Sequence, residues 1–334
     1  MQWGWTLDEN NYATSTGKNG ITAKVIQDSV CTRTATRITT FELEYPRFIH
    51  SEFMTHRMLS RNAASSRAIP ISKLVSLVEQ NPARPVEWGK NIKGMQATEQ
   101  LDMPELLQAS QLWNDIARTT CSVARKFDSL KLHKQVSNRI LEPYQMIKVV
   151  CTATSYDNFF HLRKHPDAQP EIKELATAMW EACNRSNPIG IAAGEWHVPY
   201  ILREDTEQGL QYYILEEQDN LEKHTAKTYL TAEQAIMISA SCCAQVSYRI
   251  LNTDIAKAQD IFAKLVESKP VHASPLEHQA TPMTNLTNSC SSCDSWEKGV
   301  THSDRGGVLW SGNFKYWIQH RQLIEDHVVW NYRE

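Results

Sequence analysis

Strand-like and helix-like patterns follow one another in this chain without the regular strand–helix–strand alternation of parallel α/β proteins. Residues 41–45, "FELEY", alternate apolar and acidic side chains, which predicts a strand with one buried face. Apolar side chains recur at helical spacing along 104–127, and Pro104 suits a first turn, so this segment predicts a long amphipathic helix. The irregular order of the two patterns predicts an α+β fold.

Other segments carry weaker but similar patterns. Pro46 ends the first predicted strand, and the apolar spacing that follows it predicts a helix through "RFIHSEFMTHRML" (47–59). The Pro, Gly and Lys residues of 81–96 predict a long loop. Two strands are expected to be joined across Gly209, and three more helices are expected; the strands cover 195–205 and 210–217, and the helices 170–186, 231–251 and 254–268.

Composition excludes several classes of protein. The chain has 334 residues, of which 41% are hydrophobic and 22% charged, as in a globular protein with a sizeable core. The formal net charge of −3 makes general nucleic-acid binding unlikely as a function. We find no apolar run of the roughly 18 residues that cross a membrane and no signal-peptide pattern, and therefore expect a cytoplasmic protein that binds no membrane. Eight cysteines in a chain this long do not indicate a disulfide framework.

The stretch 55–67, "THRMLSRNAASSR", is unusually basic and rich in hydroxyl groups. It holds three arginines and three serines and no acid. Arginine matches phosphate oxygens, and serine hydroxyls can donate to the same oxygens, so this composition suits a nucleotide phosphate. A solvated basic turn is the alternative. Ala63 and Ala64 speak against that alternative, because small residues let a ligand approach the backbone closely.

Two further clusters suggest metal sites without completing one. His161 and His165 are four residues apart and could share a helix face, but no third ligand is apparent, and Arg163 between them favours an anion. The pair Cys290 and Cys293 is half of a zinc site, but a second pair is missing, and ordinary loop cysteines are the favoured interpretation. Cys242 and Cys243 lie in an apolar segment that predicts core positions; the chain has no P-loop, nucleophile-elbow or dinucleotide fingerprint.

The segment "HRMLSRNAASSR" resembles the signature of the flavin-dependent thymidylate synthases, R-H-R followed by seven residues and S. His56 and Arg57 match the second and third signature residues, and Ser65 matches the serine. Residues 138–143 and 158–172 resemble the second conserved half of that family. Residues 242–248 and 272–282 resemble the segment that normally opens the family's chain.

The order of these blocks departs from the family. The block that normally comes first follows the signature here, as in a circular permutation, and 313–324 echoes 47–59, as in a partial duplication. We expect one elaborated domain. Residues 20–190 would carry the signature and nucleotide-binding half, 191–230 a β-hairpin insertion, and 231–334 the flavin-binding block. Several family residues are also replaced, namely at Thr55, Ala63, Ala64 and Gln245.

The resemblance implies an antiparallel sheet with packed helices and a methyltransferase. Members of the family convert dUMP to dTMP with FAD, NADPH and methylenetetrahydrofolate, as homotetramers with active sites between subunits; a dimer is the alternative for this chain. The resemblance assigns the substrate to Ser65, Arg67, Arg139 and Arg163, with Arg163 and Ser65 as catalytic residues. It assigns FAD to His56, Arg57, Asn62, Asn158, Ser247, His272, Ser274 and Glu277, and it implies no metal.

Alternative functions remain open from the sequence alone. The chain could act on another pyrimidine nucleotide such as dCMP, or be an inactive regulatory module, which Thr55 and Ala63 favour. A flavin enzyme acting on nucleic acid and a metal hydrolase built on His161 and His165 are the others. Glu195 and His197 match nothing in the family and have no assigned role.

Overall fold

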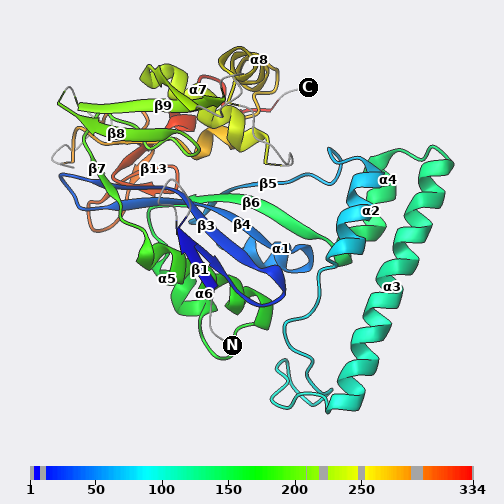
Figure 1. Ribbon diagram of the computed structural model, residues 1–334. Helices are drawn as coiled ribbons and strands as arrows, with labels where there is room; N and C mark the ends of the chain where they lie inside the picture. The colour runs from blue at the N-terminus through cyan, green and yellow to red at the C-terminus, as the bar shows by residue number, and fades with distance from the viewer. Residues whose placement is uncertain are drawn as a thin grey trace.

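The computed structural model describes residues 4–7, 13–207, 209–217, 225–246, 253–286 and 296–332. Its centre is a seven-stranded sheet in the order β1-β2-β3-β4-β6-β5, with β7 added to β3 (Figure 1). The pairings along this order are antiparallel, and only β7 runs parallel to its neighbour in this sheet. The strands are β1 (Gly4–Leu7), β2 (Ala13–Thr16), β3 (Thr22–Cys31), β4 (Arg37–Pro46), β5 (Ser60–Ala63), β6 (Met146–Ala153) and β7 (Ile189–Ile191). The α+β prediction is confirmed.

The lower face of this sheet, as seen in Figure 1, carries the main hydrophobic core. Phe41, Leu43 and Tyr45 of β4 are fully buried, as their alternation with acids predicted, and the acids between them face the other side. The core is closed by α1 (His50–Phe53), α5 (Asp157–Arg163) and α6 (Pro170–Arg185). The helix predicted at 170–186 is thereby confirmed.

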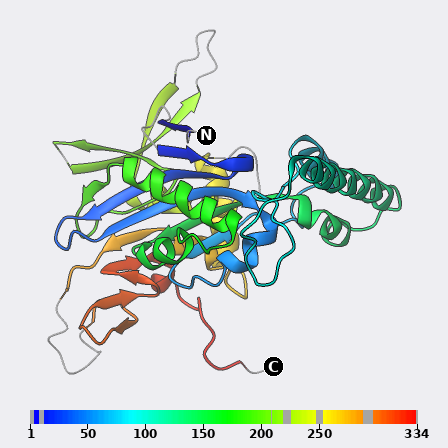
Figure 2. The same cartoon turned by 90° about the horizontal axis from the view of Figure 1, so that it is seen from below.

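A helical arm projects from the right side of the sheet in Figure 1 and is seen from below in Figure 2. It consists of α2 (Ile71–Gln80), α3 (Met103–Ser129), α4 (Lys134–Ser137) and the 3-10 segment η3 (Asn138–Tyr144). The helix predicted at 104–127 is confirmed as α3, with Pro104 in its first turn and Asp102 as N-cap. Small residues of α3 pack on α2 and η3, so the arm has a core of its own.

A second layer covers the upper face of the sheet. It is built from the chain after β7 and contains α7 (Ala232–Ala244), α8 (Ile255–Val266), the 3-10 segments η4 (Ser274–Glu277) and η6 (His320–Leu323), and the strands β8 (Leu202–Thr206), β9 (Gly209–Glu217), β10 (Thr225–Leu230), β11 (Ala280–Pro282), β12 (His302–Ser303), β13 (Leu309–Ser311), β14 (Phe314–Lys315) and β15 (Trp317–Gln319). The expected strand pair across Gly209 is present as β8 and β9, but β8 begins at Leu202, and β10 adds a third strand. Whether 191–230 is an insertion stays a prediction.

A chain of buried polar side chains joins the two layers. Ser29 Oγ lies 2.7 Å from His197 Nδ1, and His197 Nε2 lies 2.8 Å from Thr40 Oγ1. Thr40 bonds Thr152 at 2.7 Å, and Thr152 bonds His278 Nδ1 at 2.8 Å. Burial lowers the pKa of His278 to about 3, so this histidine is neutral and hydrogen-bonded rather than charged. These hydrogen bonds give His197, for which the sequence suggested no role, a structural role.

The helix expected over 47–59 is wrong in extent. A 3-10 turn η2 (Arg47–Ile49) leads into α1, which ends at Phe53. Arg61 Nη1 donates to the carbonyls of Phe53 and His56 at 3.0 and 2.9 Å, and these bonds replace the ones that a longer helix would make. The following residues form β5 on the sheet edge instead of an open loop. Among the described residues, no helix is both long and apolar enough to span a membrane.

Candidate active site

The signature stretch lies along β5, the terminal strand of the main sheet, and its two ends have different surroundings. We call Glu52, His56 and Arg163 the relay end, and Ser65, Ser66 and Arg67 the cleft end. β5 between them has four residues and spans about 13 Å. The stretch therefore brings two separate groups of polar side chains to one edge of the sheet.

At the relay end, three side chains from α1, the following turn and α5 form a hydrogen-bonded series. Arg163 Nε donates to His56 Nε2 at 2.8 Å, and Arg163 Nη1 donates to Glu52 Oε1 at 2.5 Å. The His56 ring meets the ring of Phe159 edge-on, with 4.9 Å between centroids. Burial, followed by the charges of Arg163 and Arg61, lowers the pKa of His56 to about 4. His56 is therefore a neutral imidazole at physiological pH.

This arrangement brings together residues that the resemblance assigned to different ligands. Arg163 was predicted to face the pyrimidine and His56 to contact FAD, and the two side chains touch. Arg57 is exposed and meets no acid among the described residues. Asn158 is exposed on α5, next in sequence to the Phe159 ring that supports His56. The relay end thus has a fixed core of three residues and exposed donors around it.

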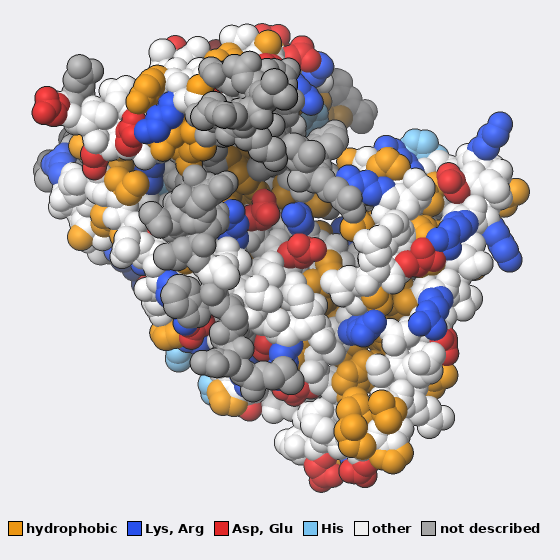
Figure 3. Space-filling view, viewed as in Figure 1, with side chains coloured by type: hydrophobic (Ala, Val, Ile, Leu, Met, Phe, Trp, Pro, Cys, Tyr) orange, Lys and Arg blue, Asp and Glu red, His pale blue; other side chains and the backbone are white. Residues whose placement is uncertain are grey.

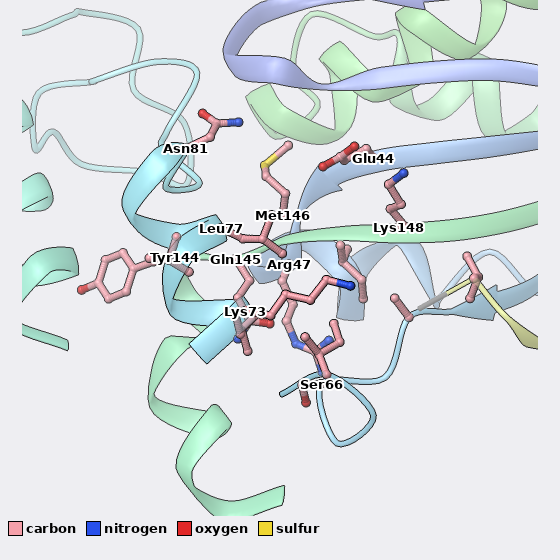
Figure 4. Close-up of a pocket in the computed structure, with 16 residues that line it drawn as sticks. Glu44, Arg47, Ser66, Lys73, Leu77, Asn81, Tyr144, Gln145, Met146 and Lys148 are labelled. Atoms are coloured by element: carbon pink, nitrogen blue, oxygen red, sulfur yellow. The ribbon is translucent and has the colours of Figure 1, made fainter. Parts of the chain in front are cut away.

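The cleft end opens on a cavity of about 230 Å³ between the upper face of the sheet and α2. Figure 3 shows the hollow between the sheet and the helical arm, with acidic and basic side chains inside it. In Figure 4, Arg47, Lys73 and Ser66 lie toward one end of the cavity and Glu44 and Lys148 toward the other. Burial raises the pKa of Glu44, while Lys148 acts in the opposite direction. The cavity therefore offers cations and a hydroxyl group on one side, and on the other a carboxyl group and a lysine whose ion pair is with Glu42.

A carboxylate of the protein contacts two of the residues that line the cationic side, Arg47 and Ser66. Glu142 Oε1 accepts from Arg139 Nη1 at 2.8 Å, lies 3.2 Å from Arg47 Nη2, and accepts from Ser66 Oγ at 3.4 Å. Arg139 was predicted to hold the nucleotide phosphate, and it lies beside the cavity with an acid already bound. Arg67 is exposed and has no acidic partner in the described part of the chain.

The block predicted to bind FAD lies against the signature strand. Ser274 Oγ donates to Asn62 Oδ1 at 3.4 Å, although the two residues are 212 positions apart. Asn62 Nδ2 in turn donates to the carbonyl of Cys243 at 2.5 Å, at the end of α7. His272 and Ser274 are exposed, whereas Glu277 is paired with Arg321 of the 313–324 echo. Ser247 lies outside the described residues.

Four residues of the site escaped the sequence-based prediction. Glu52, Arg47, Lys73 and Glu142 lie outside the signature pattern, and the partners of Glu52 and Arg47 come from elsewhere in the chain. Only Glu142 carried a local signal, because it follows Arg139 by three residues, the spacing of an ion pair on one helical face.

The alternative metal sites do not gain support. The helix α5 ends at Arg163, so the helical spacing assumed for His161 and His165 is wrong, and His165 Nδ1 lies 3.6 Å from Asp167 instead. Within the described ranges, no three His, Cys, Asp or Glu side chains gather as metal ligands. Cys290 and Cys293 lie outside those ranges. Cys242 and Cys243 are fully buried, as predicted.

Comparison with known proteins identifies a family. A family model described as thymidylate synthase complementing protein matches residues 11–189, which include the signature, Arg139 and Arg163. The matched stretch ends before 242–282, so the role of that block stays a prediction. A search of curated proteins finds no match.

Two solved structures of the UMP/dUMP methylase PolB from Streptomyces cacaoi are weakly similar to the chain. The one bound with 5-Br dUMP is 15% identical, with a TM-score of 0.38, over 45% of this chain and 67% of that chain. The one bound with 5-Br UMP is 16% identical, with a TM-score of 0.38, over 49% of this chain and 89% of that chain. Likeness this weak carries no conclusion about the ligand. The family match, however, covers more than half of the sequence, and by it this chain belongs to the thymidylate synthase complementing protein family, whose members are methyltransferases.

Proposed function

We propose that this protein methylates a pyrimidine deoxynucleotide reductively, converting dUMP to dTMP with FAD, NADPH and methylenetetrahydrofolate. The observation that carries the proposal is that the family match contains both ends of the signature stretch, with Ser66 lining a cavity that Arg47 and Lys73 also line, and with Arg163 at the other end. We expect the protein to work in the cytoplasm.

The cleft end is the proposed phosphate site. Ser65 and Arg67 flank Ser66, which lines the cavity together with Arg47 and Lys73. Arginine forks and hydroxyl groups suit phosphate oxygens, and charge-assisted hydrogen bonds of this kind are the strong ones. The cavity of about 230 Å³ is smaller than most ligand pockets, which run from roughly 300 to 1,000 Å³. It suits part of a mononucleotide and leaves no room for a dinucleotide beside it.

The relay end is the proposed site of the pyrimidine ring. Arg163 is a fixed cation there, and a cation held in place before reaction stabilises negative charge that develops on the ring. Its guanidinium has five N–H groups, and the described residues accept from only Nε and Nη1, so the other N–H groups can address a ligand. His56 adds a neutral ring beside it. No cysteine is needed as a nucleophile, and burial raises the pKa of both Cys151 and Cys242 to about 12.

The residues around β5 and η4 fit a flavin dinucleotide outside the cavity. Arg57 is an exposed cation that can meet a diphosphate, and Asn62, Ser274 and His272 place further polar side chains on the same edge of the sheet. When bound, FAD would supply the hydride and methylenetetrahydrofolate the carbon. The exposed Arg57 and Arg67 also suit a homo-oligomer, a tetramer or a dimer, in which ligands or neighbouring subunits neutralise them.

The test is spectroscopic and isotopic. The purified protein is titrated with FAD, and the reduced, deuterium-labelled flavin is then incubated with methylenetetrahydrofolate and either dUMP or dCMP. We expect a change in the flavin spectrum and deuterium in the product from dUMP. A protein that never alters the flavin spectrum would contradict the proposal. If only dCMP gives a product, dCMP and not dUMP is the substrate.

A regulatory module is the second candidate, favoured by Thr55 in place of the first signature arginine and by Ala63, which packs against the core beneath β5. It predicts tight dUMP binding by the free protein with no product under any combination of flavin and folate. The same two measurements therefore separate the candidates.

A further inference from the structure

Glu52 lies outside the signature, and its carboxylate belongs to the relay end. Its carboxylate accepts from Arg163 Nη1 at 2.5 Å, and its backbone carbonyl accepts from the Thr55 hydroxyl at 2.8 Å, which shapes the turn toward His56. The side chains of Glu52 and Arg163 are 30% and 21% exposed, so the pair is partly buried and remains accessible to a ligand.

The direction of hydrogen bonding fixes the protonation of His56. A guanidinium stays protonated in proteins and has no acceptor atom, so Arg163 Nε must donate to His56 Nε2. Nε2 must then carry the lone pair, and the proton of the neutral ring must sit on Nδ1. The low pKa of the ring agrees with this neutral form.

Glu52 determines whether Arg163 can make that bond. Arg163 is the last residue of α5, and its long side chain must reach back to the turn after α1. The bond to Glu52 holds the guanidinium in one plane, and Phe159 holds the imidazole edge-on at 4.9 Å. Without the carboxylate, the guanidinium loses its fixed partner and the imidazole is free to exchange its proton between the two nitrogens.

We propose that Glu52 is a positioning residue that, through Arg163, holds His56 in the Nδ1–H tautomer and so keeps Nδ1–H of His56 as a hydrogen-bond donor. This inference rests on the proposed function only for the identity of the ligand that the Nδ1–H group of His56 would meet. The tautomer itself is a property of the free protein. Glu52 does not touch the reacting atoms; it acts through Arg163.

The first test measures the tautomer directly. Protein labelled with ¹⁵N-histidine is studied by long-range ¹H–¹⁵N NMR at pH 7, and the His56 signals are assigned with His56→Gln. We expect the Nδ1–H form in the wild type and in Glu52→Gln, whose amide oxygen can still accept from Arg163. In Glu52→Ala we expect a mixture with the Nε2–H form, which free imidazoles favour. An unchanged Nδ1–H signal in Glu52→Ala overturns the proposal.

A matched variant separates this role from general loss of an ion pair. Glu79 pairs with Arg125 at 2.6 Å between α2 and α3 and makes no contact with the relay end. Glu79→Ala should leave the His56 signals unchanged, and a shift there would show that the NMR change reports overall stability. Circular dichroism checks that both alanine variants are folded.

Turnover gives the second readout. If dUMP is methylated, Glu52→Ala should lower kcat by about tenfold with little change in the KM for dUMP, and Glu52→Gln should restore most of it. A rise in KM alone would overturn the positioning role. If the wild type shows the Nδ1–H form but no turnover, the proposed function fails while the tautomer inference stands.

Discussion

The two ends of the signature stretch handle positive charge in opposite ways. At the relay end, Arg163 is largely buried and shared between Glu52 and His56. At the cleft end, Arg67 is exposed and has no acid among the described residues, beside a cavity lined by further cations. A cation neutralised within the protein can be oriented before a ligand arrives, whereas exposed cations attract the ligand and are neutralised by it. We therefore infer that the relay end orients the pyrimidine ring and that the cleft end binds the phosphate.

The largest expected effect comes from removing the fixed cation. Arg163→Ala should lower kcat/KM for dUMP by about 10²- to 10³-fold, the usual cost of losing a group that stabilises developing charge. Steady-state methylation assays measure it. The free energy of unfolding should change by only about 1 kcal/mol, because the pair with Glu52 is partly exposed.

Arg163→Lys is the matched control. It keeps the charge but cannot donate from Nε to His56 and from Nη1 to Glu52 together. Activity close to that of the wild type would mean that the positive charge alone matters and that the two hydrogen bonds of Arg163 are not needed for catalysis.

Removing an exposed cation from the cleft end should act on binding. Arg67→Ala should raise the KM for dUMP by roughly 10- to 100-fold, as expected for the loss of a hydrogen bond to a charged group, with kcat almost unchanged. Arg118, an exposed arginine on α3 that pairs with Asp115, provides the control, and Arg118→Ala should change neither constant. If Arg67→Ala instead lowers kcat with KM intact, the division of labour between the two ends is wrong.

The carboxylate of Glu142 makes the cleft end resemble the relay end, because it neutralises cations from within the protein. It accepts from Arg139 and Ser66, where a phosphate would bind. Glu142→Gln should tighten dUMP binding by about three- to tenfold, because a partly exposed charge that competes with the phosphate is worth about 1 kcal/mol. Calorimetry at low salt measures it. Weaker binding would show that Glu142 organises the arginines rather than competing with the ligand.

The sequence predicted one end of this comparison better than the other. Ser65 and Arg67 were predicted because the signature fixes their spacing, and Arg163 because residues 158–172 resemble the second conserved half of the family; their roles stay predictions. Glu52 was missed because its partner, Arg163, lies 111 positions further along the chain and no local pattern joins the two. Local periodicity likewise predicted β4 and α3.

The docking of the second layer was beyond local patterns. His197 is buried by Ser29 and Thr40, which are more than 150 positions away. No sequence pattern near residue 197 indicates these partners, so local spacing cannot predict hydrogen bonds of this kind. The same holds for Ser274 beside Asn62, which depends on how η4 is carried over the sheet.

The smallest expected effect is the response of the relay end to pH. The pKa of His56 is lowered from 6.5 to about 4, so the ring stays neutral and able to accept from Arg163 as pH falls from 8 to about 5. The stability that the neutral ring contributes is complete above 6.5 and is lost as pH falls toward 4. A nucleotide phosphate, with a second pKa near 6, loses charge in that interval, so dUMP binding at the cleft end should weaken by a few-fold between pH 7 and 5. Wild type and His56→Gln should therefore show parallel dUMP dissociation curves over this range. A step in the dissociation constant near pH 6.5 that vanishes in His56→Gln would mean that His56 titrates when the ligand binds. The contrast between a relay end neutralised within the protein and a cleft end neutralised by the ligand would then no longer hold.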